Sequence, residues 1–392
     1  MDILQTRRYD LDWLRILAFG LLIFYHIGMF YVSWDFHVKS VHAGPFAEPL
    51  MKLLNPWRLS LLFFISGVAI RFASDKHPNI IRFTWQRTLH LFIPIVFGIH
   101  IIVAPQAYLQ LLENGEITQG FWQFYPDYLK GSTSKYSIIL PTWNHLWYVV
   151  YLMIYTLLVA PFFRPLSKFM CGKGARLTQK LFAGKRGVLT LTVLGTLPFM
   201  IYRFWLKPIY PSTHAFVGDW ANHQLYIMIF LLGFLLAKDK AFWNVVKRAL
   251  KPTLWAIFFI VMTAILVWNF DFKHSGNTSL QLVEFFEERT RKTLYAWLCI
   301  LAFLGLAQKY LNRPSRALTY MTEAIFPWYI LHQTIIIMAG YSLTRQGLSV
   351  GVEFILVTLA TIAGCAIGNE FLIRRWTWIR PLFGLKRNAL KP

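Results

Sequence analysis

About ten long apolar stretches, separated by shorter polar segments, dominate this sequence and restrict the folds that it can adopt. A helix needs about 20 consecutive apolar residues to cross the hydrocarbon core of a bilayer. Of the 392 residues, 56% are hydrophobic and only 15% are charged, whereas soluble domains carry about 25% charged residues. Pattern and composition together predict an all-α fold, a polytopic integral membrane helical bundle of about ten transmembrane helices.

The predicted spans cover most of the chain and leave room for little more than connecting loops. No soluble domain, low-complexity linker or internal repeat is evident, so we expect a single membrane domain over residues 1–392. The first apolar run is long and lacks a small-residue cleavage site, which favours a retained signal anchor over a cleavable signal peptide. The expected spans are residues 13–33, 57–73, 89–104, 145–163, 188–204, 221–237, 253–270, 293–310, 322–341 and 350–373.

Lysines and arginines are concentrated in the amino-terminal segment, in every second loop after it and in the carboxyl-terminal segment. Because loops rich in these residues stay in the cytoplasm, the alternation predicts that both termini are cytoplasmic. The densest run extends from Arg164 to Arg186. We expect it to determine topology and to contact anionic lipid headgroups, with docking of a phosphate-bearing ligand as the alternative.

The formal net charge of +22 raises the question of nucleic-acid binding. The basic residues, however, form short clusters between apolar spans, and no nucleic-acid motif is visible. We therefore expect the lipid bilayer as a partner and no nucleic acid. The three cysteines, Cys171, Cys299 and Cys365, are scattered and suggest no disulfide framework.

Arg15 and His26 are the only strongly polar residues in the apolar stretch from Trp13 to Val32. They are eleven positions apart, so on a helix they share one face and lie roughly 16 Å from each other. Ionisable residues at membrane depth are expensive and are functional by default. Asp12 precedes His26 by fourteen positions and lies close to the same face. The alternative is a snorkelling arginine and a histidine that is hydrogen-bonded in the core.

Further polar side chains occur in or beside the other spans. None of the histidines has a metal-ligand spacing such as H-E-x-x-H, so we expect no metal site. His145 and His332 are candidates for direct contact with a substrate or for structural hydrogen bonding. The candidates for binding a substrate, whether it donates or accepts a transferred group, are Asp12, Arg58, Ser66, Arg87, His90, His145 and His332.

The segment of residues 105–144 is rich in tyrosine, tryptophan and phenylalanine. Aromatic residues collect at membrane interfaces in many proteins, which is one explanation for the segment. A platform on which sugar rings stack is the other. In the first outer loop, Asp35 and His37 either orient a polar acceptor or are simply solvated.

Four short strings occur in order along the chain: YDLDWLRILAFGLLIFYH, FFISG, HLWYV and YILHQT. Together they resemble the membrane acyltransferase-3 family, whose amino-terminal signature is an arginine and a histidine separated by ten residues. The resemblance extends over nearly the whole chain. The runs HIGMFYVSWDFHVKS and IYPS are similar to the branch of that family that succinylates periplasmic glucans.

The resemblance implies transfer of an acyl group from cytoplasmic acyl-CoA, as a co-substrate, to an extracytoplasmic hydroxyl. It implies that Arg15 is the family arginine and His26 the essential histidine. Arg87 matches the first arginine of an R-x-x-R element linked to the donor, but His90 stands in place of the second. This difference puts a donor-phosphate role of that element in doubt, although Arg82 or Arg71 could compensate.

The sequence therefore predicts an O-acyltransferase of the inner membrane that moves a succinyl or acetyl group onto an exported or periplasmic glycan. An arginine at the inner mouth suits CoA phosphates, and a neutral imidazole deeper in the groove can accept a hydroxyl proton. His26 acts either as a general base or as an acyl carrier. The alternative function is a multispan proton-coupled transporter or exporter, because intramembrane arginine and histidine also occur in such pathways.

Overall fold

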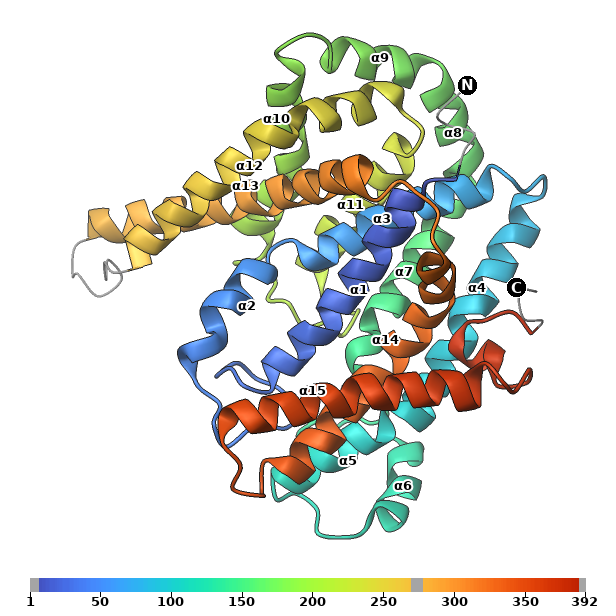
Figure 1. The fold of residues 1–392 in the computed structure, drawn as a ribbon, viewed down its shortest axis with the longest axis vertical. Helices are drawn as coiled ribbons and strands as arrows, with labels where there is room; N and C mark the ends of the chain where they lie inside the picture. Colours follow the sequence, from blue (N-terminus) through green and yellow to red (C-terminus); the bar gives the residue numbers. More distant parts are fainter. Residues whose placement is uncertain (1–6, 269–277, 388–392) are drawn as a thin grey trace. The chain divides into compact units, whose positions relative to one another are not determined.

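The computed structural model describes residues 7–268 and 278–387 of the chain. It is 76% helical, and the only β pairing in the described residues is an isolated bridge between Ser132 and Leu140. The all-α prediction is confirmed (Figure 1). Residues 269 and 270, the expected end of the seventh span, lie outside the described part of the chain.

Among the described residues, nine helical segments are long and apolar enough to cross a membrane. A shorter apolar helix, Trp220–Leu236, occupies the position of the expected sixth span. Each expected span therefore has a helical counterpart, and the chain is a multi-pass membrane protein. The nine segments are Tyr9–Met29, Pro45–Ser74, Ile80–Glu113, Asn144–Cys171, Gly187–Leu206, Lys240–Val267, Thr278–Tyr310, Arg316–Leu343 and Val350–Ile373.

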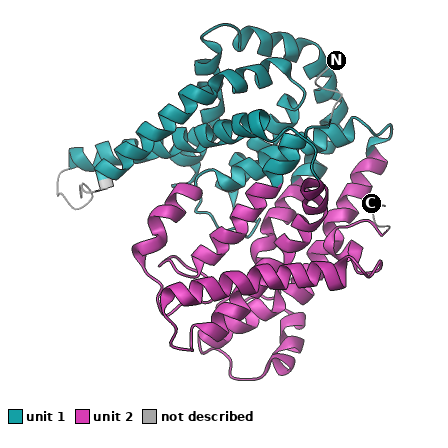
Figure 2. Ribbon diagram, viewed as in Figure 1, with its two compact units in different colours: residues 1–15, 55–80, 155–315 teal, residues 16–54, 81–154, 316–392 magenta. Residues whose placement is uncertain are grey.

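The α-helices form two compact units, which Figure 2 distinguishes by colour. Unit 1 comprises residues 1–15, 55–80 and 155–315, and unit 2 comprises residues 16–54, 81–154 and 316–392. The first helix, α1 (Tyr9–Met29), begins in unit 1 and continues into unit 2. The organisation of the chain as a single membrane domain stays a prediction.

Unit 1 contains α3 and the helices from α8 to α13. Its most extensive helix contact among the described residues joins α3 to α11, and a glycine lies on each side of that contact. A β-carbon on Gly67 would lie 2.0 Å from the carbonyl oxygen of Phe230, and one on Gly233 would lie 2.1 Å from that of Phe64. The missing side chains let the two backbones touch. The bounds are α3 Arg58–Ser74, α8 Phe163–Cys171, α9 Lys173–Leu181, α10 Gly187–Met200, α11 Trp220–Leu236, α12 Lys240–Trp268 and α13 Thr278–Tyr310.

Unit 2 is built around α14, which packs against α5 and α15. Its core joins the second half of α1, the middle of α14 and the start of α15 through large apolar side chains. Ile27, Phe30, Ile336, Ile337 and Val357 in this core are fully enclosed. His26 and His332 come from the same stretches of α1 and α14. The bounds are α2 Glu48–Leu54, α4 Ile80–Phe97, α5 Ala104–Glu113, α6 Phe121–Lys130, α7 Trp147–Val159, α14 Arg316–Leu343 and α15 Val350–Ile367.

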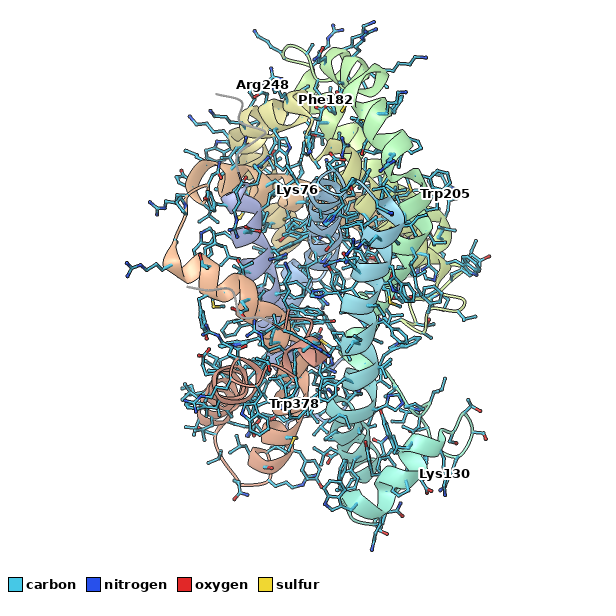
Figure 3. The ribbon with its side chains drawn as sticks, turned by 90° about the vertical axis from the view of Figure 1, so that its right-hand side faces the viewer. Lys76, Lys130, Phe182, Trp205, Arg248 and Trp378 are labelled. Carbon is cyan, nitrogen blue, oxygen red and sulfur yellow. The ribbon has the colours of Figure 1, made fainter. Side chains whose placement is uncertain are left out.

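The segment of residues 105–144 is more ordered than the sequence suggested. A π-helical turn, Gly98–Ile102, connects α4 to α5, so the third span continues to Glu113 instead of ending at residue 104. The apolar residues Ala104, Ala107 and Leu111 are buried on one face of α5. Its polar residues lie on the other face, and for this reason the segment resembles a loop in the sequence. Lys130 ends α6 (Figure 3).

Most aromatic side chains of this segment pack on one another in a small core of their own. Phe124 and Tyr128 are fully buried there, and the Tyr128 hydroxyl donates to the Ile99 carbonyl at 2.7 Å. Packing within the segment therefore explains most of its aromatic content. Trp122, with 79% of its surface exposed, is the exception.

Gly67→Ala should destabilise the protein, because the new methyl group must push α3 away from α11. Overpacking of this kind costs about 1–3 kcal/mol. The matched control is Gly20→Ala in α1, where a β-carbon meets nothing within 4 Å. Thermal unfolding in detergent measures both variants. Equal melting temperatures for the two would show that the helices can separate without cost.

Candidate active site

Three histidines from distant parts of the sequence converge inside unit 2. They are His26 on α1, His145 in the short 3-10 helix Asn144–Leu146, and His332 on α14. The Nδ1 atom of His26 lies 2.9 Å from Nε2 of His332, a hydrogen bond across 306 positions of sequence. The rings of His145 and His332 meet edge to face with centroids 5.1 Å apart. The sequence singled out all three residues but gave no indication that they touch.

Packing restricts the rings of this histidine cluster. His332 has no exposed surface, whereas His26 is only partly buried. Phe36 stacks nearly parallel to the His26 ring, with an interplanar angle of 18° and a centroid distance of 6.5 Å. An imidazole held between an aromatic ring and a second imidazole has few orientations available.

His145 is anchored from two directions. Its Nε2 donates to the carbonyl of Ile330 at 3.0 Å, and its own carbonyl accepts a hydrogen bond from the Tyr329 hydroxyl. The Nδ1 atom is buried and has no hydrogen-bond partner among the described residues. A buried acceptor without a partner is costly, so a hydroxyl donor from a substrate would relieve that cost.

A second polar cluster surrounds Gln106, a residue that the sequence analysis did not single out. Gln106 is fully buried, and its Nε2 donates to Thr334 at 2.7 Å. Its Oε1 accepts from Asn144 at 2.9 Å and from Gln333 at 3.1 Å. These bonds tie α5 to α14 and to the loop that carries His145. An amide within the apolar string IIVAPQAYLQLL was the signal that could have identified it.

His37, in the first outer loop, also takes part in a hydrogen bond rather than standing free in solvent. Its Nδ1 lies 2.7 Å from Oε1 of Gln110. Burial lowers the pKa of the His37 imidazole, which outweighs the opposite effect of the bond to Gln110.

Arg15 and Asp12 lie at a cavity in unit 1. The cavity has a volume of about 940 Å³, and basic side chains predominate among its polar lining residues. Asp12 is bound to Arg7 at 2.9 Å, while Nε of Arg15 is buried with no hydrogen-bond partner among the described residues. The charge balance of the lining suits an anion. The polar lining residues are Arg7, Arg8, Asp12, Arg15, Lys76, His77 and Lys238.

Some of these basic groups are already paired. Arg8 is bound to the fully buried Asp10 at 2.6 Å and lies over the Trp243 ring at 3.9 Å. Lys238 contacts Asp75 at 2.7 Å. Burial is the largest single influence on the pKa of the Asp75 carboxyl and raises it, but the hydrogen bonds and charges of Lys238 and Arg71 together hold this pKa below its usual value. Ion pairs therefore hold several of the charged side chains of the cavity wall in fixed positions.

The remaining candidates divide between the two units. Arg58 and Ser66 are on α3 in unit 1, and neither lines the cavity; Arg58 is buried and donates to Asn55 at 2.6 Å. Arg87 and His90 lie about one turn apart on α4 in unit 2. The positive charges of Arg87 and Lys386 both act on His90.

The two residues of the amino-terminal pair share one unbroken helix, because α1 extends from Tyr9 to Met29. This part of the prediction is confirmed. Although three histidines converge, the described residues contain no group of three or more His, Cys, Asp or Glu side chains placed to hold a metal ion.

Comparison with known proteins identifies the family. A family model described as "Acyltransferase domain" matches residues 8–370. Curated relatives include the glucans biosynthesis protein C of Escherichia coli K12 and that of Escherichia coli O1:K1, each 23% identical over 368 residues, or 92% of this chain and 90% of the relative. No solved structure matches the chain. The chain therefore belongs to the acyltransferase-3 family of membrane acyltransferases.

Proposed function

We propose that this protein is an inner-membrane O-acyltransferase that moves a succinyl or acetyl group from cytoplasmic acyl-CoA to a hydroxyl of an exported glycan. The observation that carries the proposal is the hydrogen-bonded pair of His26 and His332 on two apolar helices. Ionisable side chains at membrane depth are rare because they are costly, and those that occur mark functional sites. The glycan acceptor is suggested by the distant similarity to glucans biosynthesis protein C.

The cavity of unit 1 supports acyl-CoA as the donor. Coenzyme A carries a diphosphate and a further phosphate, and guanidinium groups bind phosphate oxygens in pairs. Arg15 has a buried nitrogen with no hydrogen-bond partner in the part of the chain that the structure describes, and the wall adds Lys76 and Lys238. The donor would sit with its phosphates against this wall.

In the direct mechanism, His26 takes the proton of the acceptor hydroxyl while the oxygen attacks the thioester carbonyl. The new C–O bond forms as the C–S bond breaks, and the coenzyme A thiolate leaves and collects the proton from His26. The products are the acylated glycan and free coenzyme A. In the stepwise alternative, His26 attacks the thioester carbonyl, and the C–S bond breaks as the acyl-imidazole forms and the coenzyme A thiolate leaves. The hydroxyl oxygen then takes the acyl group as the N–C bond breaks, and the hydroxyl proton ends on the thiolate.

His26→Ala should abolish glycan acylation, because general-base catalysis of this kind contributes typically 10²–10⁴ in rate. Mass spectrometry of extracytoplasmic glycans from cells with the wild type, the variant and no gene measures the effect and identifies the acyl group. The control is His223→Gln, which removes a histidine bound to Tyr155 at 2.9 Å in unit 1. Retained acylation in His26→Ala would remove His26 from the mechanism. If the glycans of all three strains, including the wild type, carry no acyl group, the result would favour the alternative function of a transporter.

Arg15→Gln and Lys76→Gln should each raise KM for acyl-CoA about tenfold with little change in kcat. A charged hydrogen bond contributes about 1.5–3 kcal/mol, and the lost contact is made to the donor before the reaction begins. The matched control is Arg248→Gln, which removes an arginine bound instead to the carbonyl of Phe182 at 2.8 Å (Figure 3). An acyl-pantetheine donor, which lacks the diphosphate, should not distinguish the variants from wild type. An unchanged KM for acyl-CoA would place the donor elsewhere.

A further inference from the structure

The hydrogen bonds of the histidine cluster determine where each imidazole carries its proton. Nδ1 of His332 lies 2.6 Å from the backbone carbonyl of Tyr329, one turn earlier on α14. A carbonyl oxygen can only accept, so Nδ1 of His332 is the donor of this bond. The proton of a neutral His332 is therefore at Nδ1, and its Nε2 has the lone pair.

His332 is in the neutral form in this arrangement. Its side chain has no exposed surface, and a buried imidazolium loses its hydration unless an anion compensates. Its hydrogen bonds in the described residues go to the backbone of Tyr329 and Trp328 and to His26, none of which is a carboxylate.

The lone pair on Nε2 of His332 determines which nitrogen of His26 carries a proton. Because Nε2 of His332 is the acceptor of the 2.9 Å bond, Nδ1 of His26 must be the donor. A neutral His26 then has its available lone pair on Nε2. A base or a nucleophile at Nε2 requires this tautomer, because the other tautomer carries a proton there.

We propose that His332 is a positioning residue that fixes the tautomer of His26, so that Nε2 of His26 is the reactive atom. The proposal rests on the proposed function and deepens it, and it holds for either mechanism. His332 acts through His26 and does not itself exchange a proton or an acyl group. It takes the place that a carboxylate or a backbone carbonyl takes beside other functional histidines.

The surroundings of His332 suit a residue that must hold one orientation. The Tyr329 ring lies 5.7 Å from the His332 ring at an angle of 32°, and the His145 ring closes the other side at 85°. Tyr329 is itself held by its hydroxyl bond to the His145 carbonyl. The bond from His332 to the Tyr329 carbonyl and the rings that hold His332 in place thus belong to the same buried cluster.

Two substitutions separate this role from simple packing. His332→Asn places an amide near Nδ1, where it can still donate to Tyr329, but leaves no acceptor for His26. His332→Gln extends one carbon further, so its amide oxygen can accept from Nδ1 of His26. We expect kcat to fall roughly tenfold to a hundredfold in His332→Asn, with KM for acyl-CoA unchanged, and His332→Gln to recover most of the loss.

The matched controls are His223→Asn and His223→Gln, which remove a histidine with the same kind of bonds, to Tyr155 at 2.9 Å and to the Phe216 carbonyl at 2.7 Å. Both should keep wild-type kcat. Size-exclusion profiles in detergent confirm that all four variants are folded. Equal losses of kcat in His332→Asn and His332→Gln, or a rise in KM alone, would overturn the proposal.

Nitrogen-15 NMR of histidine-labelled protein tests the tautomer without any reference to activity. The His26 signals are identified by their loss in His26→Gln. We expect a proton on Nδ1 of His26 in the wild type and a mixture of tautomers in His332→Asn; a proton on Nε2 of His26 in the wild type would contradict the inference. If the expected tautomer is found but no acyl transfer is detected, the proposed function fails while the assignment of His332 stands.

Discussion

The bond between His26 and His332 is the interaction on which the functional part of unit 2 depends. Within apolar helices, a polar side chain has no water to bind and must find a partner in the protein. The two imidazoles are partners for each other, and the Tyr329 carbonyl completes the chain. The same requirement explains the bonds around Gln106, which tie α5 to α14 next to the cluster.

Unit 1 instead places charged side chains beside a cavity. Its basic cavity is bordered by Arg15, whose Nε is buried and lacks a hydrogen bond in the described residues, and by basic groups fixed to Asp10 and Asp75. Fixed positive charges near an open volume favour anionic ligands, since the protein does not have to reorganise when they bind. The two units thus offer two different chemistries, an imidazole cluster in one and an anion-binding wall in the other.

Much of this could be predicted from the sequence, because hydrophobic length and charge patterning act locally. Arg15 and His26 stood out since each is an isolated polar residue in an apolar run, and the expected helix around them is present. The structure corrects the extent of the third span, where the polar residues of α5 resembled a loop. Their apolar neighbours, including Ala107 and Leu111, are buried on the opposite face of a helix. A helix whose apolar residues occupy one face only is hidden when hydropathy is averaged along the sequence.

By itself, the sequence determined that the chain is a helical multi-pass membrane protein and which residues are exceptional within its helices. These are properties of single segments in an apolar solvent. Only the tertiary structure decided that His26 contacts His332, because that bond joins residues 306 positions apart and no local pattern encodes it. Likewise, the role of Asp12 as a partner of Arg7 depends on side-chain geometry at the cavity. Which polar groups meet is a consequence of helix packing, and packing is settled by the whole set of contacts at once.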